Sequence, residues 1–582
     1  MRLFIAFVLW VLEGPNDTLA QSRHLPILPD SVILHLSQEI SGQIAKRNIE
    51  FVARHHRMRG SRGFHAAAAF IVEQLRSYGL SDAKIEQFPA DGKTFYGPQK
   101  ARKAWWRENE NLVRWGHLDS FANTPGFAFM ITLKQARALQ ARLSAGEKIT
   151  LKATVRAGRH EGFYEVVTAT IPGVDPILKA EEIAFSCHLD HQLPGANDNS
   201  SGSTAILEVA RTFASLIHQG KLPPPARTLR FIWPPEIEGT HALLSSRPEL
   251  ATRIKAVVHM DMVGGGAETK AIFHVTRGPA SLPSIVNDVA ETVGEFVNRQ
   301  SQAFAMGSDI PFPLISPTGG KEALQADFAE FTMGSDHEVY TDASYGIPAI
   351  YLNDWPDRYI HTNFDTPANI DPTKLKRATF IGAASAWVLA NLKAADAPGL
   401  WQVEQVLALR RTAKILQCRN QVDDDEAQNL TRFHHWYERQ VFESTSRFFA
   451  IPESLRQEAA RFFDNLAEVT GKPSPAAPAH NEGGLVFRRT NTFKGPLSTF
   501  GYDYFADHYG DEAANGVGLL SYRGPRGSGG EYAYEVLNFV DGRRTVRQIR
   551  DNVAAIYGPV PVEMVMEYLR ALEKIDVVGK AN

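Results

Sequence analysis

An imidazole and two carboxylates gather after an apolar stretch in the first half of the chain. Residues 183–187 form an apolar run typical of a buried strand, and His188 and Asp190 follow it. Side chains two positions apart on a strand share one face, so these two groups are expected to lie together. Asp198 comes after a short Pro/Gly turn, just before the helical pattern of residues 204–217. Neutral imidazole and carboxylate oxygen both suit zinc, so the unit is a candidate metal site, although such residues more often end a strand in solvent.

Two later strands also end in acidic residues. Residues 229–233 lead to Glu236 and Glu238, and residues 254–259 lead to Asp261. Helical connections separate these strands, and this alternation is typical of a parallel sheet. The carboxyl ends of parallel strands meet at one edge, where open α/β sheets place their sites. The expected fold is therefore α/β, with a mixed, largely parallel sheet flanked by helices.

Two more histidines lie before and after another expected strand. The segment Ser-Asp-His at residues 335–337 precedes an expected strand at residues 347–352, and His361 lies in the loop after that strand. Residues 372–392 have the pattern of a long helix that closes the domain. His337 and His361 are thus further candidates for a site at the same edge of the sheet.

Taken in chain order, these segments resemble the secreted co-catalytic zinc aminopeptidases, which form metallopeptidase family 28 of clan MH. The resemblance covers roughly residues 29–392. Each segment is weak alone, and six in the family's order are specific. The segments are 187–190, 195–199, 235–240, 259–264, 335–337 and 361–366. The resemblance implies an enzyme that hydrolyses N-terminal residues from peptides.

The resemblance also implies a role for each matched residue. Asp198 would bridge two zinc ions, with His188 and Asp261 on one of them. His361 and a glutamate would hold the other ion, and Asp190 would orient His188. A bridging water would lose its proton to a general base and attack the scissile carbonyl, with both metals stabilising the oxyanion.

The sequence departs from the family at the glutamates. Relatives have Glu-Glu-x-Gly, with the base first and the ligand second, whereas this chain has Glu236, Ile237, Glu238 and Gly239. Aligning on the glycine puts Ile237 at the ligand position, and isoleucine cannot bind zinc. We expect Glu236 to act as the base and Glu238 to replace the ligand, giving two zinc ions per chain. The alternatives are that Glu236 becomes the ligand, or that the second zinc is weak or absent. His337 is expected to hydrogen-bond the tetrahedral intermediate.

The 582-residue chain has room for three to four domains. Residues 1–20 are typical of a secretory signal peptide, with Arg2, a short apolar run and small residues before Gln21. An uncleaved anchor is the alternative. We therefore expect a secreted or periplasmic protein.

The remaining domain boundaries come from composition and from resemblance. We expect a zinc peptidase domain at residues 29–395, with the remnant of a protease-associated insertion at about 95–165. Residues 396–472 have a charged helical pattern, and residues 473–484 form a Pro/Ala-rich linker. Residues 485–582 resemble the small winged-helix modules of peptide chaperones in ribosomal-peptide maturation.

Charge and hydropathy limit the partners. The formal net charge is -3, and the arginines within residues 543–550 are expected to form a solvated helix face, so nucleic acid is not an expected partner. No later run is long and apolar enough for a membrane span, so we expect no stable membrane association after removal of the signal. The segment 55–57, His-His-Arg, could line a site or be solvated, and a solvated position is favoured. The expected partners are peptide substrates, and the sequence leaves the oligomeric state open.

Two other functions fit the same residues. A glutaminyl-cyclase-like aminoacyltransferase shares the fold and works with one zinc, and the isoleucine at residue 237 keeps it open. A peptide-binding module that has lost turnover is the other alternative. Retention of His188, Asp198, Asp261 and His361 argues against that loss, because buried carboxylates without a cation are costly.

Overall fold

The computed structural model describes residues 24–102, 104–107, 130–154, 157–472, 481–490, 493–499 and 501–581. The expected signal peptide, residues 1–20, lies outside the described residues, as does most of the expected linker. Within the described residues, no helix is both long enough and apolar enough to cross a membrane.

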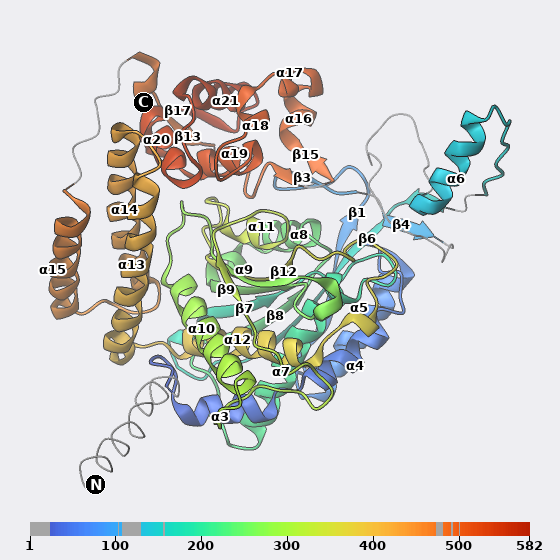
Figure 1. Cartoon of the computed structure of the whole chain (residues 1–582), viewed down its shortest axis with the longest axis horizontal. Coiled ribbons are helices and arrows are strands. Elements are labelled where there is room, and N and C mark those ends of the chain that lie inside the picture. Colours follow the sequence, from blue (N-terminus) through green and yellow to red (C-terminus); the bar gives the residue numbers. More distant parts are fainter. Residues whose placement is uncertain are drawn as a thin grey trace, which may run out of the picture.

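An eight-stranded mixed sheet forms the centre of the molecule (Figure 1). Its central strands β8, β7, β9 and β12 are parallel to one another. The pairs β1–β6, β6–β8 and β10–β12 are antiparallel, and β11 pairs with β10 in parallel fashion. The largely parallel sheet expected from the sequence is therefore confirmed. In spatial order the strands are β1 (Lys84–Ala90), β6 (Gly162–Ile171), β8 (Thr228–Trp233), β7 (Glu182–Ser186), β9 (Ile254–Asp261), β12 (Ala349–Trp355), β10 (Ile272–Thr276) and β11 (Asp327–Ala329).

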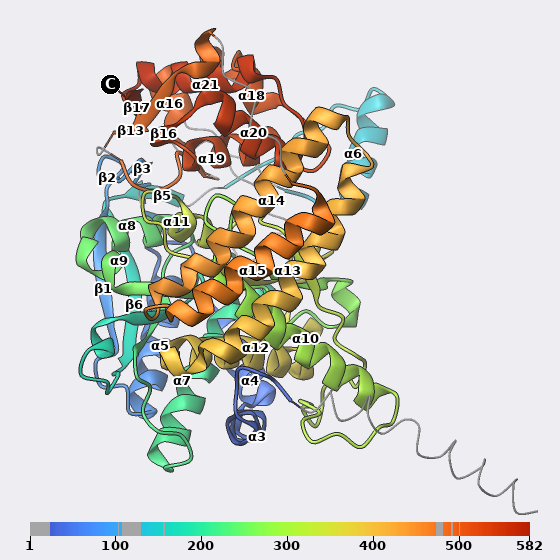
Figure 2. The same cartoon turned by 90° about the vertical axis from the view of Figure 1, so that its left-hand side faces the viewer.

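Helices cover both faces of this sheet (Figures 1 and 2). Strand β7 shows why, because its apolar side chains alternate between two cores: Ile183 and Phe185 pack into the larger one, and Ala184 into the smaller. The larger core is completed by α3 (Asp30–Glu39), α4 (Gly42–Val52), α5 (Arg62–Ser77), α7 (Gly202–His218), α10 (Ile285–Ala305) and α12 (Pro372–Asn391). The smaller core lies under α8 (Glu238–Ser246), α9 (Pro248–Arg253) and α11 (His337–Thr341).

A short hairpin of β2 (Phe95–Tyr96) and β3 (Gln99–Lys100) follows β1. Strands β4 (Ala104–Arg107) and β5 (Ala157–His160) then pair, and α6 (Leu133–Ser144) lies between them in sequence. Helix α6 stands away from the body of the molecule (Figure 1). This excursion occupies the region where the remnant of a protease-associated insertion is expected, and residues 108–129 of it lie outside the described residues.

Three long helices run along one side of the molecule (Figure 2). They are α13 (Ala397–Arg419), α14 (Asp424–Ser444) and α15 (Glu453–Thr470). Arg411 ties two of them to the central region, because its guanidinium lies 2.7 Å from both Asp288 on α10 and Glu438 on α14. The helical segment expected after the central domain therefore packs on it through buried charges.

The last part of the chain, residues 481–581, is called the C-terminal unit below. It has a three-stranded antiparallel sheet in the order β16-β13-β17 and an apolar core that Leu430 and Phe433 of α14 share. The helices expected at residues 546–557 and 561–572 correspond to α20 (Val546–Tyr557) and α21 (Val562–Lys574). The sheet strands are β13 (Val486–Arg489), β16 (Asp541–Thr545) and β17 (Val578–Lys580), and the other elements are β14 (Ser498–Thr499), β15 (Tyr502–Asp503), α16 (Tyr504–Tyr509), α17 (Asp511–Asn515), α18 (Gly518–Ser521) and α19 (Gly529–Asn538).

Candidate metal centre

Two groups of potential metal ligands meet at one aspartate. The first group is His188, Asp198 and Asp261, and the second is His191, Asp198 and His361. Within each group the potential ligand atoms all lie within 4.8 Å of one another. The structure thus brings together four of the five predicted ligands and adds His191, which the sequence analysis did not single out.

Three adjacent parallel strands position these residues. His188 and His191 lie in the loop after β7, and Asp198 follows before α7 begins. Asp261 is the last residue of β9, and His361 lies in the loop after β12. The site is therefore at the carboxyl ends of the strands, as expected from the sequence.

The first group surrounds one nitrogen of His188. Its Nε2 atom lies 3.2 Å from Asp198 Oδ1 and 3.3 Å from Asp261 Oδ1. Its Nδ1 atom lies 2.9 Å from the backbone carbonyl of Asp190, which can only accept a hydrogen bond. Nδ1 therefore carries the proton, and in the neutral ring the lone pair of Nε2 points at the two carboxylates.

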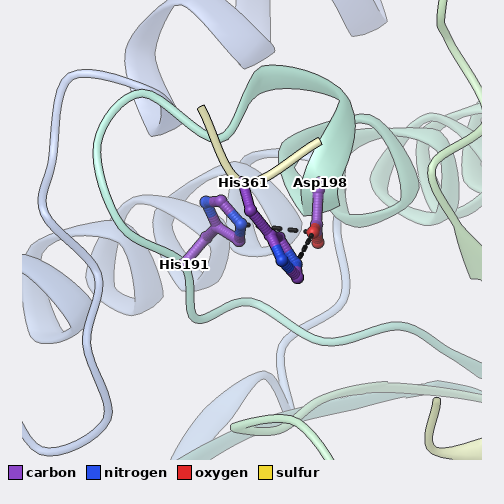
Figure 3. A group of neighbouring side chains, drawn as sticks. All are labelled: His191, Asp198 and His361. Carbon is purple, nitrogen blue, oxygen red and sulfur yellow. Dashed lines mark ion pairs between the residues drawn. The ribbon is translucent and has the colours of Figure 1, made fainter. Parts of the chain in front are cut away.

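The second group has the same design. His191 Nδ1 lies 2.8 Å from the backbone carbonyl of Gln192, so this nitrogen is the donor. His191 Nε2 then lies 3.2 Å from Asp198 Oδ2, and His361 Nε2 lies 3.1 Å from the same oxygen. Figure 3 shows both rings directed at the Asp198 carboxylate. Each oxygen of Asp198 thus belongs to a different group.

These residues fit a divalent metal such as zinc. His188 Nε2 and Asp261 Oδ1 are buried and have no hydrogen-bond partner among the described residues, yet they face each other and Asp198. Burial favours the neutral ring, but Glu236 and Asp261 raise the pKa of His188 well above its usual value. Burial likewise opposes ionisation of Asp198, but the charge of His191 and the close contacts with His188, His191 and His361 hold its pKa well below the usual value. A cation between these donors would balance the negative charge of the carboxylates. Imidazole nitrogen and carboxylate oxygen are both ligands that zinc prefers.

Glu236 lies beside the first group. Its Oε1 atom is 4.0 Å from His188 Nε2, and its side chain is 12% exposed. Burial is the main cause that raises its pKa well above the usual value, and Asp261, Asp190 and Asp198 add to it while His188 opposes. A carboxylate with a raised proton affinity beside a metal centre has the properties of a general base.

Asp190 links that base to His188. Its Oδ1 atom accepts a hydrogen bond from the backbone N–H of Glu236 at 2.6 Å, and its backbone carbonyl accepts from His188. Its Oδ2 atom accepts from Arg59 at 2.8 Å. The predicted orienting role of Asp190 thus has a geometric basis on both sides.

Glu238, the predicted replacement ligand, lies elsewhere. Its carboxylate is buried and faces two arginines, with Arg59 Nε at 3.2 Å and Arg102 in direct contact. Ile237 turns the chain at a φ of 60° and packs its side chain into the smaller core, which directs Glu238 into the first turn of α8. The geometry therefore offers His191 as the third donor of the second group in place of Glu238. The signal in the sequence is the position of His191, directly after Asp190.

Arg57 fixes the loop that carries His191. The sequence favoured a solvated position, but this arginine is fully buried. Its guanidinium donates to the carbonyls of Leu189 at 2.9 Å and Gly195 at 3.0 Å, and its backbone N–H donates to the carbonyl of His191 at 2.8 Å. Burial lowers its pKa to about 10, although Asp190, Asp365 and Asp198 act in the opposite direction. Arg57 therefore stabilises the loop that carries His191.

Other residues join the loops from the separate strands. Asp365 accepts hydrogen bonds from the backbone N–H groups of Asn197 at 2.7 Å and Asp198 at 3.0 Å. The Asn197 side chain accepts from the backbone of Gly264 at 3.0 Å. The loops after β7, β9 and β12 therefore form one hydrogen-bonded unit around Asp198.

His337 is buried, with 1% exposure, and its Nε2 atom donates to the carbonyl of Thr332 at 2.7 Å. Its ring stacks on Tyr351 with centroids 4.0 Å apart. Burial lowers the pKa of His337 to about 4. Nδ1 of His337 has no hydrogen-bond partner among the described residues, and a hydrogen bond from this residue to an intermediate stays a prediction.

The fold and the site define an α/β domain that gathers potential metal ligands at the carboxyl ends of parallel strands. Residues 166–386 match the family model of peptidase family M28. Leucine aminopeptidase 1 of Trichophyton rubrum is 30% identical over 237 residues, which is 34% of this chain and 62% of that protein. Leucine aminopeptidase 1 of Phaeosphaeria nodorum is 27% identical over 227 residues, 37% of this chain and 53% of that protein. The chain thus spans less than two thirds of the length of these curated relatives.

Solved structures are similar at lower identity. An aminopeptidase from Aneurinibacillus sp. strain AM-1 is 21% identical with a TM-score of 0.38, over 60% of this chain and 95% of that one. A zinc aminopeptidase from Bacillus subtilis is 16% identical with a TM-score of 0.41, over 60% of this chain and 96% of that one.

Proposed function

We propose that this protein is a zinc-dependent aminopeptidase with two metal ions per chain, which hydrolyses N-terminal residues from peptides. The observation that carries the proposal is the sharing of Asp198, because its Oδ1 faces His188 and its Oδ2 faces His191 and His361. A carboxylate with one oxygen in each group is suited to bridge two ions. The match of residues 166–386 to the model of peptidase family M28 supports this reaction class, and so does the similarity to the leucine aminopeptidases.

The roles of the residues follow from their contacts. When bound, the metal ions would supply an activated water and charge stabilisation at the reacting carbonyl. His188 and Asp261 would hold one ion and His191 and His361 the other, with Asp198 between them. Glu236 takes a proton from the attacking water and passes it to the leaving amine.

Asp190 supports both partners in this arrangement. Its bond to the Glu236 N–H holds the backbone that carries the base, and its carbonyl fixes the tautomer of His188. Arg59 keeps Asp190 ionised, because this guanidinium and His188 lower its pKa in opposition to the desolvation that raises it. The His188 ring and the backbone of Glu236 can then not move away from the centre without breaking a buried hydrogen bond.

The glutaminyl-cyclase-like alternative rested on a lost ligand at residue 237. His191 supplies a donor on that side of Asp198, so the second group does not depend on the missing glutamate. The retained base Glu236 also argues for turnover over peptide binding alone. We keep hydrolysis as the proposed reaction on these two grounds.

Export and domain organisation remain part of the proposal. We propose that residues 1–20 are removed as a signal peptide and that the mature protein acts outside the cytoplasm. The C-terminal unit combines α19, α20 and α21 with a three-stranded antiparallel sheet, and this combination supports a winged-helix-like domain.

The proposal is tested with the purified full-length mature protein and leucyl-p-nitroanilide or a leucyl peptide. We expect release of the N-terminal residue, loss of release after treatment with a chelator, and recovery on addition of zinc. An N-terminal glutamine peptide should be hydrolysed without cyclisation. Cyclised product with release of ammonia and no hydrolysis would overturn the proposal.

A further inference from the structure

The C-terminal unit contacts the segment that leads into the metal centre. Figures 1 and 2 show α19 of this unit next to α11. Tyr534 on α19 donates a hydrogen bond to the carbonyl of Glu338 at 2.8 Å, and its hydroxyl lies 3.0 Å from Thr341 Oγ1. Its ring stacks on Phe331, with centroids 5.2 Å apart. Tyr534 therefore contacts both α11 and the loop before it.

Two further contacts hold the end of α11. Asn538, also on α19, accepts a hydrogen bond from the backbone N–H of Ala343 at 2.9 Å. Arg489 on β13 donates to both oxygens of Asp342, at 3.0 and 3.3 Å. Asp342 is 1% exposed, so this pair is largely shielded from water. The C-terminal unit thus contacts residues in α11 and residues directly after its C-terminal end.

The other end of the same segment reaches the metal ligands. Ser335 donates a hydrogen bond from its hydroxyl to Asp261 Oδ2 at 2.7 Å. The same hydroxyl oxygen lies 2.8 Å from Nε2 of His259. Asp336 accepts from the backbone N–H of Ile237 at 2.7 Å, next to the base Glu236. Ser335 thereby leaves Asp261 Oδ1 directed at His188.

We infer that the C-terminal unit positions the metal centre, with Tyr534 as the positioning residue that holds α11 so that Ser335 can orient Asp261. The inference rests on the proposed metal centre. The path has three steps: Tyr534 fixes the backbone of α11, α11 fixes Ser335 at its N-terminal side, and Ser335 fixes one oxygen of a ligand. Partners of metal ligands tune affinity because they set ligand orientation.

The interface beside Tyr534 is incompletely filled, which makes its few polar contacts matter. A cavity of about 440 Å³ lies there, with Met333 and Asp342 on one side and Phe505, Leu537 and Tyr568 of the unit on the other. Val339 and Tyr340 pack α11 on the smaller core, so on the side that faces the C-terminal unit the polar contacts hold the helix end beside this cavity. Burial raises the pKa of Tyr534 well above its usual value, so the phenol keeps the proton that it donates.

The chain offers a matched control for Tyr534. Tyr532 lies on the same helix, is fully buried, and donates its hydroxyl to the carbonyl of Gly558 at 2.8 Å. Gly558 belongs to the C-terminal unit itself, so Tyr532→Phe removes an equivalent hydrogen bond without touching α11. Tyr534→Phe removes the contact to α11 and keeps the aromatic ring.

The experiment measures zinc dissociation constants of the full-length wild-type, Tyr534→Phe and Tyr532→Phe proteins by competition with a chelator. The visible spectra of the three cobalt(II)-substituted proteins are recorded as well. We expect Tyr534→Phe to raise the zinc dissociation constant of the more strongly affected site by about threefold to tenfold. The cobalt spectrum should change as well. Tyr532→Phe should lower the melting temperature by a similar amount but leave affinity and spectrum as in the wild type.

Each outcome decides the inference. Wild-type zinc affinity in Tyr534→Phe overturns it, and so do equal losses of affinity in both variants, which would show a general effect of stability. A wild-type protein that binds no zinc overturns the proposed function itself, and that result is distinguishable because it appears before any variant is compared.

Discussion

His191 is the residue whose replacement separates this metal centre from the one expected from the sequence. The change is His191→Ala, which removes one of the three donors of the second group and leaves His188, Asp198 and Asp261 in place. Glu238→Gln is the companion variant, because Glu238 was the predicted ligand but lies between Arg59 and Arg102. The two variants make opposite predictions for metal content.

The size of the effect follows from the number of donors. Zinc binding at structural sites is worth about 10–16 kcal/mol, so one of three protein donors contributes about 3–5 kcal/mol. That corresponds to a dissociation constant raised by roughly two to four orders of magnitude. His191→Ala should therefore hold one zinc ion tightly and lose the other at low free zinc.

The assay is elemental analysis after dialysis against a buffer that fixes free zinc. His435→Ala is the control, because this buried histidine on α14 bonds to Thr470 Oγ1 at 2.7 Å, in the helical segment after the central domain. We expect one zinc per chain in His191→Ala, and the wild-type content in both His435→Ala and Glu238→Gln. Full content in His191→Ala together with loss in Glu238→Gln would refute the assignment.

Two further variants test the base and the loop. Glu236→Gln should lower kcat by about 10²- to 10⁴-fold while zinc content stays unchanged, because it removes a proton acceptor but no ligand; steady-state kinetics and elemental analysis check this, and near-normal turnover would contradict it. Gly195→Ala should weaken the second zinc site and lower the melting temperature, because Gly195 has a φ of 57° and an added Cβ would lie 2.3 Å from His191 Nδ1. Gly146→Ala is the matched control, since this glycine also has a positive φ but nothing lies within 4 Å of the added Cβ, so a loss of zinc there would contradict the reasoning.

Much of the fold is predictable because it depends on local pattern. The apolar run at residues 183–187 and the expected strand at residues 254–259 correspond to β7 and β9, and the expected helix at residues 372–392 corresponds to α12. The order of these elements places His188, Asp198, Asp261 and His361 at one edge, and the structure brings them together.

The fate of the glutamates depends on contacts that are distant in the sequence. Glu238 pairs with Arg59 and Arg102, which are far from it along the chain, and no local spacing reveals two buried arginines. The conformation of Ile237 at positive φ is also unexpected for a β-branched residue.

His191 was missed for a related reason. Its direction depends on the loop held by Arg57, whose carbonyl contacts form only in the folded chain. His337 was assigned from resemblance, and the structure buries it against Tyr351. Side-chain direction in loops was thus the part that pattern and resemblance did not supply.

The most direct test of the central claim is the zinc content of the purified wild-type protein, measured by elemental analysis after dialysis without chelator. A centre built on both oxygens of Asp198 predicts two zinc ions per chain. One ion or none would contradict the two-metal centre and would mean that His191 does not make up for the isoleucine at position 237.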